Sequence, residues 1–368
     1  MGSVLYVNRM PSPCGVYEFG HAVGKVVCES NVHRFTYCEC NDWGTFQKAQ
    51  DVVKPDVVIF NYFSGVTSWI DSHVDELKAI SVGTIHEVYQ NLADHMDNAL
   101  FDYHIAPDPS LLLRNPIVYK TGRLIPREKR LHVHEKNTVA TFGSFGFATY
   151  GKGFEYTLRR IQKEYDMARV RFNIPVHSET DPEGKLVHAV ENRLRRIAKP
   201  GIQLEITHSY FPHGELLRFL ASNDANIFLY AYQPRRGLSS VADLALASGR
   251  PLVLSKGGMF RHFKTCVPSV YIEDRPIRAI VEDGLEGLPK LQEEWSPENL
   301  LRDYERIVTD VLKRGKRRGT PDAVRASPHW RRTDLLLAIF KRLAVPVSVR
   351  IEEFLCRQAS KRWKREVL

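Results

Sequence analysis

The sequence of 368 residues has no run of about 18 consecutive apolar residues, and its first residues lack a charged segment followed by an apolar one. We therefore predict neither a membrane-spanning helix nor a signal peptide. The six cysteines are scattered, and a single Cys-x-Cys is their only close spacing, so neither a disulfide framework nor a zinc site is expected. Free thiols of this kind suit the reducing cytoplasm, where we expect the protein to reside.

Two motifs that would signal cofactor chemistry are also missing. No Gly-x-Gly-x-x-Gly follows the first predicted strand, so the sequence gives no support for a dinucleotide site. No Asp-x-Asp occurs, and we therefore expect no catalytic divalent ion and assign no metal ligands. The sequence predicts no cofactor.

The composition is that of an ordinary globular protein, with 43% hydrophobic and 26% charged residues. A chain of this length has room for two domains with cores of their own. The net charge of +9 is concentrated toward the C-terminus, in basic runs at residues 313–318 and 361–365. Such runs attract nucleic acid or anionic lipid headgroups, or they only make a tail more soluble. No RNP-like or helix-turn-helix pattern accompanies them, so we expect no nucleic acid partner.

The most informative stretch runs from residue 202 to residue 263, where strand and helix patterns alternate. Strands are predicted at residues 204–207 and 225–230, and helices at residues 214–222 and 241–248. This alternation is typical of a parallel sheet flanked by helices. Ligands of such sheets bind outside the carboxyl ends of the strands, so the loops after these strands are candidate sites.

The loop after residue 230 has side chains suited to an anion. Arg235 and Arg236 offer bidentate donors, and Ser239 and Ser240 stand just before a predicted helix. Backbone N–H groups, hydroxyls and the helix dipole would converge on a phosphate there. An alternative stays open, because a serine at a helix start is usually an N-cap and paired arginines are usually solvated.

A glycine-rich loop follows the strand predicted at residues 138–142 and leads into a helix predicted at residues 154–165. Its backbone amides could approach a diphosphate closely, with Lys152 available as a point charge. The polar residues 127–136 before this strand have no period and are predicted to link two domains. A last strand is predicted at residues 270–272.

The first half of the chain also alternates strands and helices. Strands are predicted at residues 4–8 and 57–61, and a helix is predicted at residues 72–80. The strand after that helix ends in the polar pair His86 and Glu87. A histidine at a strand end is more often a satisfied structural residue than a functional one.

The second half resembles the nucleotide-sugar domain of two-domain GT-B glycosyltransferases, most closely the retaining family 4 type. The resemblance is carried by five stretches: the turn Tyr210-Phe211-Pro212, Asn-Asp-Ala at residues 223–225, Gly237-Leu238, LALASGRPLV at residues 244–253, and Lys152-Gly153. It implies an α/β fold of the GT-B type, with two Rossmann-like parallel-sheet domains facing across a cleft and with C-terminal helices. The implied domains are an N-terminal acceptor domain at residues 1–130, a nucleotide-sugar domain at residues 137–312 and a basic helical extension at residues 313–368. The last helix of the second domain is expected to cross back to the first.

The resemblance also assigns roles to residues. Those expected to bind the nucleotide sugar are Gly15, Val16, Ser144, Lys152, Gly153, Tyr210, Phe211, Pro212, Arg235, Gly237, Leu238, Ser239 and Ser240. Those expected to act in catalysis are His86, Glu87, Lys152, Arg236 and Asp243. His86 would donate a hydrogen bond to a sugar hydroxyl, and Glu87 would serve as a general base in an inverting enzyme.

Three positions depart from the family pattern. Ser144 stands where the family has an arginine, and we hypothesise that Arg235 or Arg236 supplies that charge. The two glutamates of the family fall on Arg236 and Leu244, with Asp243 beside the second. The carboxylate that grips the donor is therefore missing or displaced.

The resemblance implies a hexosyltransferase-like enzyme, retaining by analogy, that moves a sugar from a nucleoside diphosphate sugar to a glycan, lipid-linked or other acceptor. Polysaccharide biosynthesis is the implied setting, and the nucleotide sugar is a substrate and not a cofactor. The basic extension would contact an anionic membrane at its inner face or pack on the first domain. The alternative is a non-catalytic GT-B relative that binds a sugar nucleotide or glycan, which the departures at Arg236 and Leu244 favour.

Overall fold

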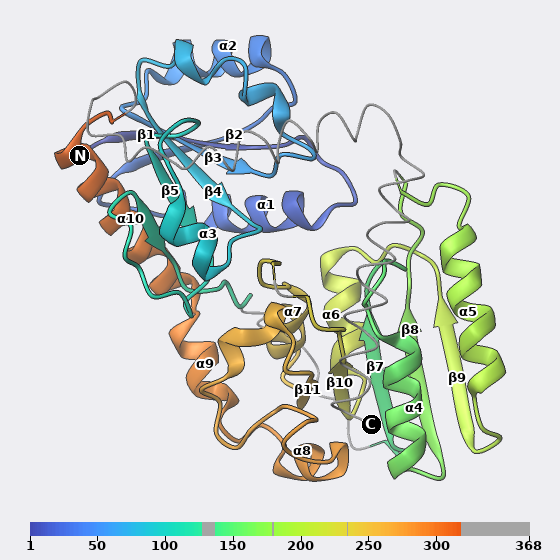
Figure 1. Ribbon diagram of the computed structural model, residues 1–368. Coiled ribbons are helices and arrows are strands. Elements are labelled where there is room, and N and C mark those ends of the chain that lie inside the picture. Colours follow the sequence, from blue (N-terminus) through green and yellow to red (C-terminus); the bar gives the residue numbers. More distant parts are fainter. Residues whose placement is uncertain (127–136, 179, 234, 318–368) are drawn as a thin grey trace. The chain divides into compact units, whose positions relative to one another are not determined.

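The computed structural model describes four ranges of the chain, residues 1–126, 137–178, 180–233 and 235–317. These residues form two compact units, each a parallel sheet with helices packed on it (Figure 1). Within the described chain, unit 1 contains residues 1–124, 235–238 and 295–317. Unit 2 contains the described residues of the ranges 125–234 and 239–294. The predicted linker at residues 127–136 and most of the predicted basic extension lie outside the described residues.

Unit 1 is built on six parallel strands in the order β2-β1-β3-β4-β5-β6. Its elements are β1 (Ser3–Asn8), α1 (Gly15–Val27), β2 (Arg34–Glu39), α2 (Trp43–Val53), β3 (Val57–Tyr62), the 3-10 turns η1 (Ser68–Ile70) and η2 (Val74–Glu76), β4 (Ile80–Ile85), α3 (Gln90–His95), β5 (Tyr103–Ala106), β6 (Val118–Lys120) and α10 (Pro297–Arg314).

The two faces of the unit 1 sheet bury alternate residues of the same strands, as the two-residue period of a strand requires. In β1, Val4 and Tyr6 join the core that includes α1 and α10, while Leu5 and Val7 join the core that includes Phe46 of α2. Both faces are covered, and β1 and β3 are accordingly apolar along most of their length.

Helix α10 packs in unit 1 although it follows the whole of unit 2 in sequence (Figure 1). Ser296 caps it by accepting the Asn299 N–H, and proline occupies its first turn. Its buried residues recur every three or four positions: Leu300, Tyr304, Ile307, Val308 and Val311. The expected return of the last helix to the first domain agrees with these contacts.

Unit 2 is built on five parallel strands in the order β11-β10-β7-β8-β9. Its elements are β7 (Thr141–Phe145), α4 (Phe154–Glu164), β8 (Ala168–Asn173), α5 (Lys185–Ile197), β9 (Ile202–Thr207), α6 (His213–Ala221), β10 (Ala225–Phe228), α7 (Val241–Ala247), β11 (Leu252–Leu254), the 3-10 helix η3 (Gly258–Phe263), α8 (Ile277–Asp283) and α9 (Leu288–Glu294).

Helices α4 and α5 cover one face of this sheet with narrow apolar stripes. Phe154, Leu158 and Ile161 of α4 recur at helical spacing, and Val187, Val190 and Leu194 of α5 do the same. All six pack in one core with β8 and β10. The remaining faces of both helices are polar, as expected for helices that lie on the surface of a sheet.

Each sheet has one point at which the order of strands reverses. In unit 1 the chain passes from β1 to β2 on one side and then to β3 on the other. In unit 2 it passes from β7 to β8 and β9 on one side and then to β10 on the other. Crevices at such reversals, outside the carboxyl ends of the strands, are where α/β sheets bind ligands. The two strand pairs β1/β3 and β7/β10 therefore locate the candidate sites.

Three predicted elements differ from the structure. A helix is predicted at residues 72–80, but the chain there forms only the 3-10 turn η2, which follows η1; Ile70, Val74 and Leu77 share one core. Residues 270–272 form an isolated bridge from Tyr271 to Leu254 and not a strand.

The third difference is the position of β7, which begins at Thr141 and not at residue 138. The Asp224 carboxylate accepts the Thr141 N–H at 2.8 Å, where the ladder starts. Gly143 is the first residue of the loop predicted from the sequence, but it lies inside β7. A Cβ at this position would stand 1.9 Å from Asn223 Nδ2, so glycine lets the Asn223 side chain approach the strand closely.

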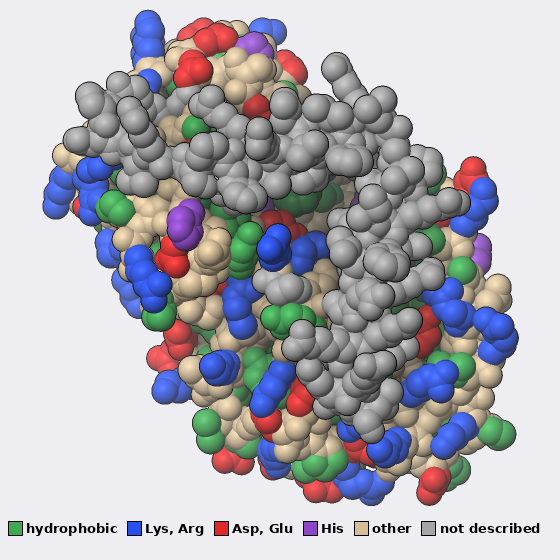
Figure 2. All heavy atoms as spheres, viewed as in Figure 1, with side chains coloured by type: hydrophobic (Ala, Val, Ile, Leu, Met, Phe, Trp, Pro, Cys, Tyr) green, Lys and Arg blue, Asp and Glu red, His purple; other side chains and the backbone are tan. Residues whose placement is uncertain are grey.

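The charged side chains are intermixed where described residues form the surface in Figure 2, with lysine and arginine lying among aspartate and glutamate. None of the helices that the structure describes combines the length and the apolar character needed to cross a bilayer.

Candidate functional site

The loop between β7 and α4 forms a glycine-rich corner at the strand reversal of unit 2. The Gly146 N–H donates to the Asn173 carbonyl at 3.0 Å, and the Ala231 N–H donates to the Gly151 carbonyl at 2.8 Å. Gly153 has a φ of +68°, and a Cβ there would stand 1.9 Å from the Leu229 carbonyl oxygen. Glycine is required at this position, because any side chain would push the loop away from the end of β10.

Lys152 lies in this corner with an aromatic partner. Its Nζ donates to the Tyr230 hydroxyl at 2.9 Å and lies 4.3 Å from the centre of the Tyr230 ring. Tyr230 is buried and its ring packs against Phe260. Among the described residues, no carboxylate forms an ion pair with Lys152. A half-buried ammonium held by an aromatic ring keeps its charge available for an anion.

The three serines predicted for the site lie within β7 and directly before α7. Ser144 is buried within β7, and Ser239 is buried and donates its N–H to the Met259 carbonyl at 3.1 Å. Ser240 precedes α7 with helical backbone angles, and its side chain forms no capping hydrogen bond. Ser240 thus occupies the N-cap position of α7, and its predicted role in binding stays a prediction.

The predicted base-contacting turn follows β9, the edge strand of the sheet. Tyr210 is 38% exposed, the Phe211 ring packs at a tilt against Phe219 with the ring centroids 5.7 Å apart, and Pro212 stands at the N-cap of α6. An exposed aromatic at a strand end is suited to stacking on a base, and this role of the turn stays a prediction.

Unit 1 carries a buried chain of side-chain amides at its own strand reversal. Asn8 ends β1, Asn61 lies near the end of β3, and His86 follows β4. Asn61 Nδ2 donates to Asn8 Oδ1 and to the Val16 carbonyl, both at 2.8 Å. Asn8 Nδ2 in turn donates to the Tyr37 hydroxyl at 2.9 Å. His86 Nε2 lies 2.7 Å from Asn61 Oδ1 at the other end of the chain.

This network fixes the tautomer of His86. Since Asn61 uses its amide nitrogen for two donations, its Oδ1 can only accept, and His86 Nε2 must carry the proton. Burial, and secondarily the Arg123 guanidinium, lower the pKa of His86 to about 4, so the ring is neutral near pH 7. The N–H expected to donate to a sugar hydroxyl is therefore engaged, and Nδ1 is left as a hydrogen-bond acceptor.

Glu87 is held by the segment 235–238, which belongs to unit 1. Arg236 Nη2 lies 2.8 Å from Glu87 Oε1, Arg236 Nε lies 3.0 Å from Oε2, and the Gly237 N–H donates to Oε2 at 2.7 Å. A Cβ on Gly237 would stand 1.9 Å from the His86 carbonyl oxygen. Arg236 and Glu87, both predicted as catalytic, thus neutralise each other. Arg235 beside them is exposed.

The remaining predicted residues fall into two environments. Gly15 begins α1, is exposed and has open space where a side chain would stand, while Val16 accepts the Asn61 amide through its carbonyl. Asp243 is buried in α7, and its carboxylate lies 3.6 Å from the buried His262 Nε2. These placements leave the catalytic and binding roles of Gly15, Val16 and Asp243 as predictions.

Three residues of these corners were not singled out from the sequence: Asn8, Asn61 and Tyr230. Each is the last residue of a strand predicted from the sequence, and each is polar at its tip. Polar side chains at the carboxyl ends of adjacent apolar strands were the signal that could have found them.

No family model matches the sequence, and no curated protein matches it. Solved structures do match its fold. HepE (Alr3699) from Anabaena, in complex with UDP and glucose, matches with a TM-score of 0.57 and 10% identity over 84% of this chain and 100% of that one. A glycosyltransferase from Rickettsia africae matches with a TM-score of 0.59 and 10% identity over 85% of this chain and 99% of its own.

A trehalose-6-phosphate synthase, studied for glycosyl transfer with retention, matches with a TM-score of 0.55 and 10% identity over 86% of this chain and 100% of that one. Identities this low show the fold alone. The expected α/β fold with two parallel-sheet domains of the GT-B type is confirmed, and the chain shares it with these glycosyltransferases.

Proposed function

We propose that the protein is a glycosyltransferase that takes a sugar from a nucleoside diphosphate sugar. The observation that carries the proposal is the corner of unit 2 at Lys152, where an ammonium without a carboxylate partner stands beside a glycine-rich loop at the strand reversal. A diphosphate needs these groups, a compact cation and backbone amides that can come close.

The molecules bound in the similar structures support a nucleotide sugar as the ligand. HepE was solved with UDP and glucose, and also with UDP-glucose. UDP-glucose is therefore the first donor to test. The free cysteines of the described chain, among them the buried Cys40 and Cys266, support a cytoplasmic location.

In this proposal catalysis is chiefly electrostatic. Loop amides and Lys152 would stabilise the charge that develops on the leaving diphosphate, which is usually the largest catalytic contribution in reactions of this kind. No divalent ion is required. His86 would orient a sugar or acceptor hydroxyl by accepting its hydrogen bond at Nδ1. Retention of configuration is proposed by analogy with the trehalose-6-phosphate synthase. The acceptor is proposed to be a glycan or a lipid-linked sugar.

The non-catalytic alternative is favoured by the state of the two carboxylates. Glu87 is neutralised by Arg236 and hydrogen-bonded by Gly237 N–H, and Asp243 is 4% exposed. Neither is placed to take a proton from an acceptor without rearrangement. A protein with this arrangement could bind a sugar nucleotide without turning it over.

A donor hydrolysis assay separates the two functions. The purified chain is incubated for hours with UDP-glucose and with a panel of other sugar nucleotides, and released nucleoside diphosphate is measured alongside binding. We expect binding and slow release for one donor, and a loss of both in Lys152→Ala but not in Lys163→Ala, an exposed lysine of α4. Binding without release would favour the non-catalytic function, and the absence of both for every donor would contradict the proposal.

A further inference from the structure

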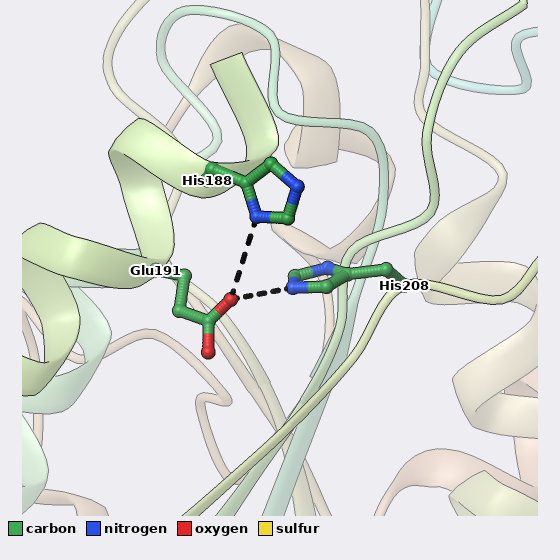
Figure 3. A group of neighbouring side chains, drawn as sticks. All are labelled: His188, Glu191 and His208. Carbon is green, nitrogen blue, oxygen red and sulfur yellow. Dashed lines mark hydrogen bonds and ion pairs between the residues drawn. The ribbon is translucent and has the colours of Figure 1, made fainter. Parts of the chain in front are cut away.

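A cluster of two histidines and one glutamate lies on unit 2, apart from the corner at Lys152. His188 and Glu191 stand one turn apart on α5, and His208 directly follows β9. His208 Nε2 lies 2.7 Å and His188 Nδ1 lies 3.9 Å from the same oxygen, Glu191 Oε2. Figure 3 shows both imidazole rings directed at this oxygen. We propose that this cluster binds a divalent transition metal of the zinc class.

The ligand atoms have the spacing that such a metal needs. All three lie within 4.8 Å of one another. With zinc bonds of about 2.0–2.1 Å, the ligand atoms of a tetrahedral site lie about 3.3 Å apart. On metal binding, the 2.7 Å separation of His208 Nε2 from Glu191 Oε2 must therefore lengthen, and the 3.9 Å separation of His188 Nδ1 from the same oxygen must shorten. His188 is 64% exposed along its side chain and can make that movement by a change of rotamer.

Hydrogen bonds around the cluster orient its ligands. His208 Nδ1 lies 3.0 Å from the Ile174 carbonyl oxygen, which can only accept, so Nδ1 carries a proton. Nε2 is then the ring nitrogen that can offer a lone pair toward the Glu191 carboxylate. Two acceptors at 2.7 Å need a cation between them, either a proton or a metal ion. A backbone carbonyl on the far nitrogen is also the usual outer partner of a metal-binding histidine.

Arg195 completes the arrangement by taking the other carboxylate oxygen. Its Nη2 lies 2.7 Å and its Nε 2.8 Å from Glu191 Oε1. Arg195 thus fixes the carboxylate and leaves Oε2 to the two histidines. Two imidazole nitrogens and one carboxylate oxygen suit zinc, cobalt or nickel better than magnesium or calcium.

A metal here would join α5 to the end of β9, which is the edge strand of the unit 2 sheet. No metal ligands were predicted from the sequence, since no Asp-x-Asp occurs, and these three residues were not singled out. His208 lies 17 residues from Glu191 in sequence. The site depends only on these three residues and not on the sugar-transfer proposal.

The test uses the full chain without a polyhistidine tag, stripped of metal with a chelator and kept reduced. Zn²⁺ alone is titrated against a chromophoric chelator, and Co²⁺ is added separately to record its visible absorption bands. We expect one tight site per chain and a Tm raised by about 5 °C at a hundredfold excess of free Zn²⁺ over its Kd. His188→Ala and Glu191→Gln should each weaken binding at least about tenfold, and His208→Ala should do the same.

The chain offers a matched control in unit 1. His73 and Glu76 form the same His-x-x-Glu pair with a 2.7 Å contact, but no described second histidine belongs to the pair. His73→Ala should leave Zn²⁺ affinity and the Co²⁺ spectrum unchanged. The proposal is overturned if the wild type binds Zn²⁺ no more tightly than His188→Ala does, or if His73→Ala weakens binding equally. Because His188 is exposed, His188→Ala stays informative even if His208→Ala does not fold.

Discussion

The two points at which the strand order reverses differ in what forms them, side chains in unit 1 and mainly backbone in unit 2. In unit 1, the corner at β1 and β3 is filled by side chains, with Asn8, Asn61 and His86 hydrogen-bonded in a row. In unit 2, the corner at β7 and β10 is made mainly of backbone, with Gly153 against Leu229 and Lys152 over Tyr230. The hydrogen-bonded row of Asn8, Asn61 and His86 in the first corner is neutral and largely satisfied. The second corner carries a charge without a carboxylate partner among the described residues.

The difference indicates a division of labour. The neutral amides of Asn8 and Asn61 fix the direction of His86, whose Nδ1 can accept a hydrogen bond from a hydroxyl. These amides offer no charge to a phosphate. A glycine loop with a lysine offers charge and amides but little side-chain specificity. We therefore assign the diphosphate to unit 2 in the proposed function. The following four experiments would break or sharpen this contrast.

The largest effect is expected for the backbone of the unit 2 corner. Gly153→Ala places a Cβ against the Leu229 carbonyl in a left-handed conformation and should lower the free energy of unfolding by about 4 kcal/mol. Gly249 has nearly the same φ, +67°, but no atom within 4 Å of its Cβ position. Gly249→Ala should therefore cost only about 1 kcal/mol. Equal losses in chemical denaturation would show that the loop does not pack closely on β10.

His86 should make stability depend on pH. Its pKa is about 4 in the folded protein against an ordinary 6.5, so the unfolded chain binds the proton more strongly. The stabilisation is complete above about pH 6.5 and is lost as the pH falls toward 4, by up to about 3 kcal/mol. In His86→Gln, the loss of unfolding free energy at low pH should be smaller by that amount. In His95→Gln, which changes an exposed histidine, the unfolding free energy should depend on pH as in the wild type. Identical profiles in urea unfolding at pH 7 and pH 4.5 would contradict a buried neutral His86.

Lys152 should contribute to nucleotide affinity. Lys152→Ala should weaken the tightest-binding nucleoside diphosphate about tenfold or more, or about 1.4 kcal/mol, because it removes the one proposed point charge on the phosphates. Lys163→Ala on the same loop-helix unit should change the Kd less than twofold. Calorimetric titration checks both. An unchanged Kd in Lys152→Ala would remove the charge distinction between the two corners.

The smallest effect is expected for the pair of Arg236 and Glu87. Arg236 is half exposed, so a double-mutant cycle of Arg236→Ala and Glu87→Gln should give a coupling free energy below about 1 kcal/mol. The same variants test the non-catalytic alternative. If Glu87 is only a structural acceptor, Glu87→Gln keeps donor hydrolysis; a complete loss of hydrolysis with unchanged binding would make Glu87 catalytic.

Much of the fold could be predicted from the sequence, because buried parallel strands are continuous apolar runs and the helices between them carry clear apolar stripes. The helices predicted at residues 214–222 and 241–248 agree to within one residue with α6 (His213–Ala221) and α7 (Val241–Ala247). The helix predicted at residues 72–80 was wrong, because Val74 and Leu77 reach the core from the short 3-10 turn η2 and the residue after it.

The candidate sites were less predictable, because they depend on contacts between distant strands. Lys152 and the glycine loop could be found from the local pattern of strand, glycines and helix. Its contact with Tyr230, 78 residues away, could not. The pairing of Glu87 with Arg236 spans 149 residues and changes the expected chemistry of both.

The most direct test of the central claim is a crystal structure with the tightest-binding nucleoside diphosphate. The account predicts the diphosphate within hydrogen-bonding distance of Lys152 Nζ and of backbone amides in the loop between β7 and α4. A nucleotide bound elsewhere on the chain, with Lys152 still on Tyr230 and the glycine loop unoccupied, would contradict it.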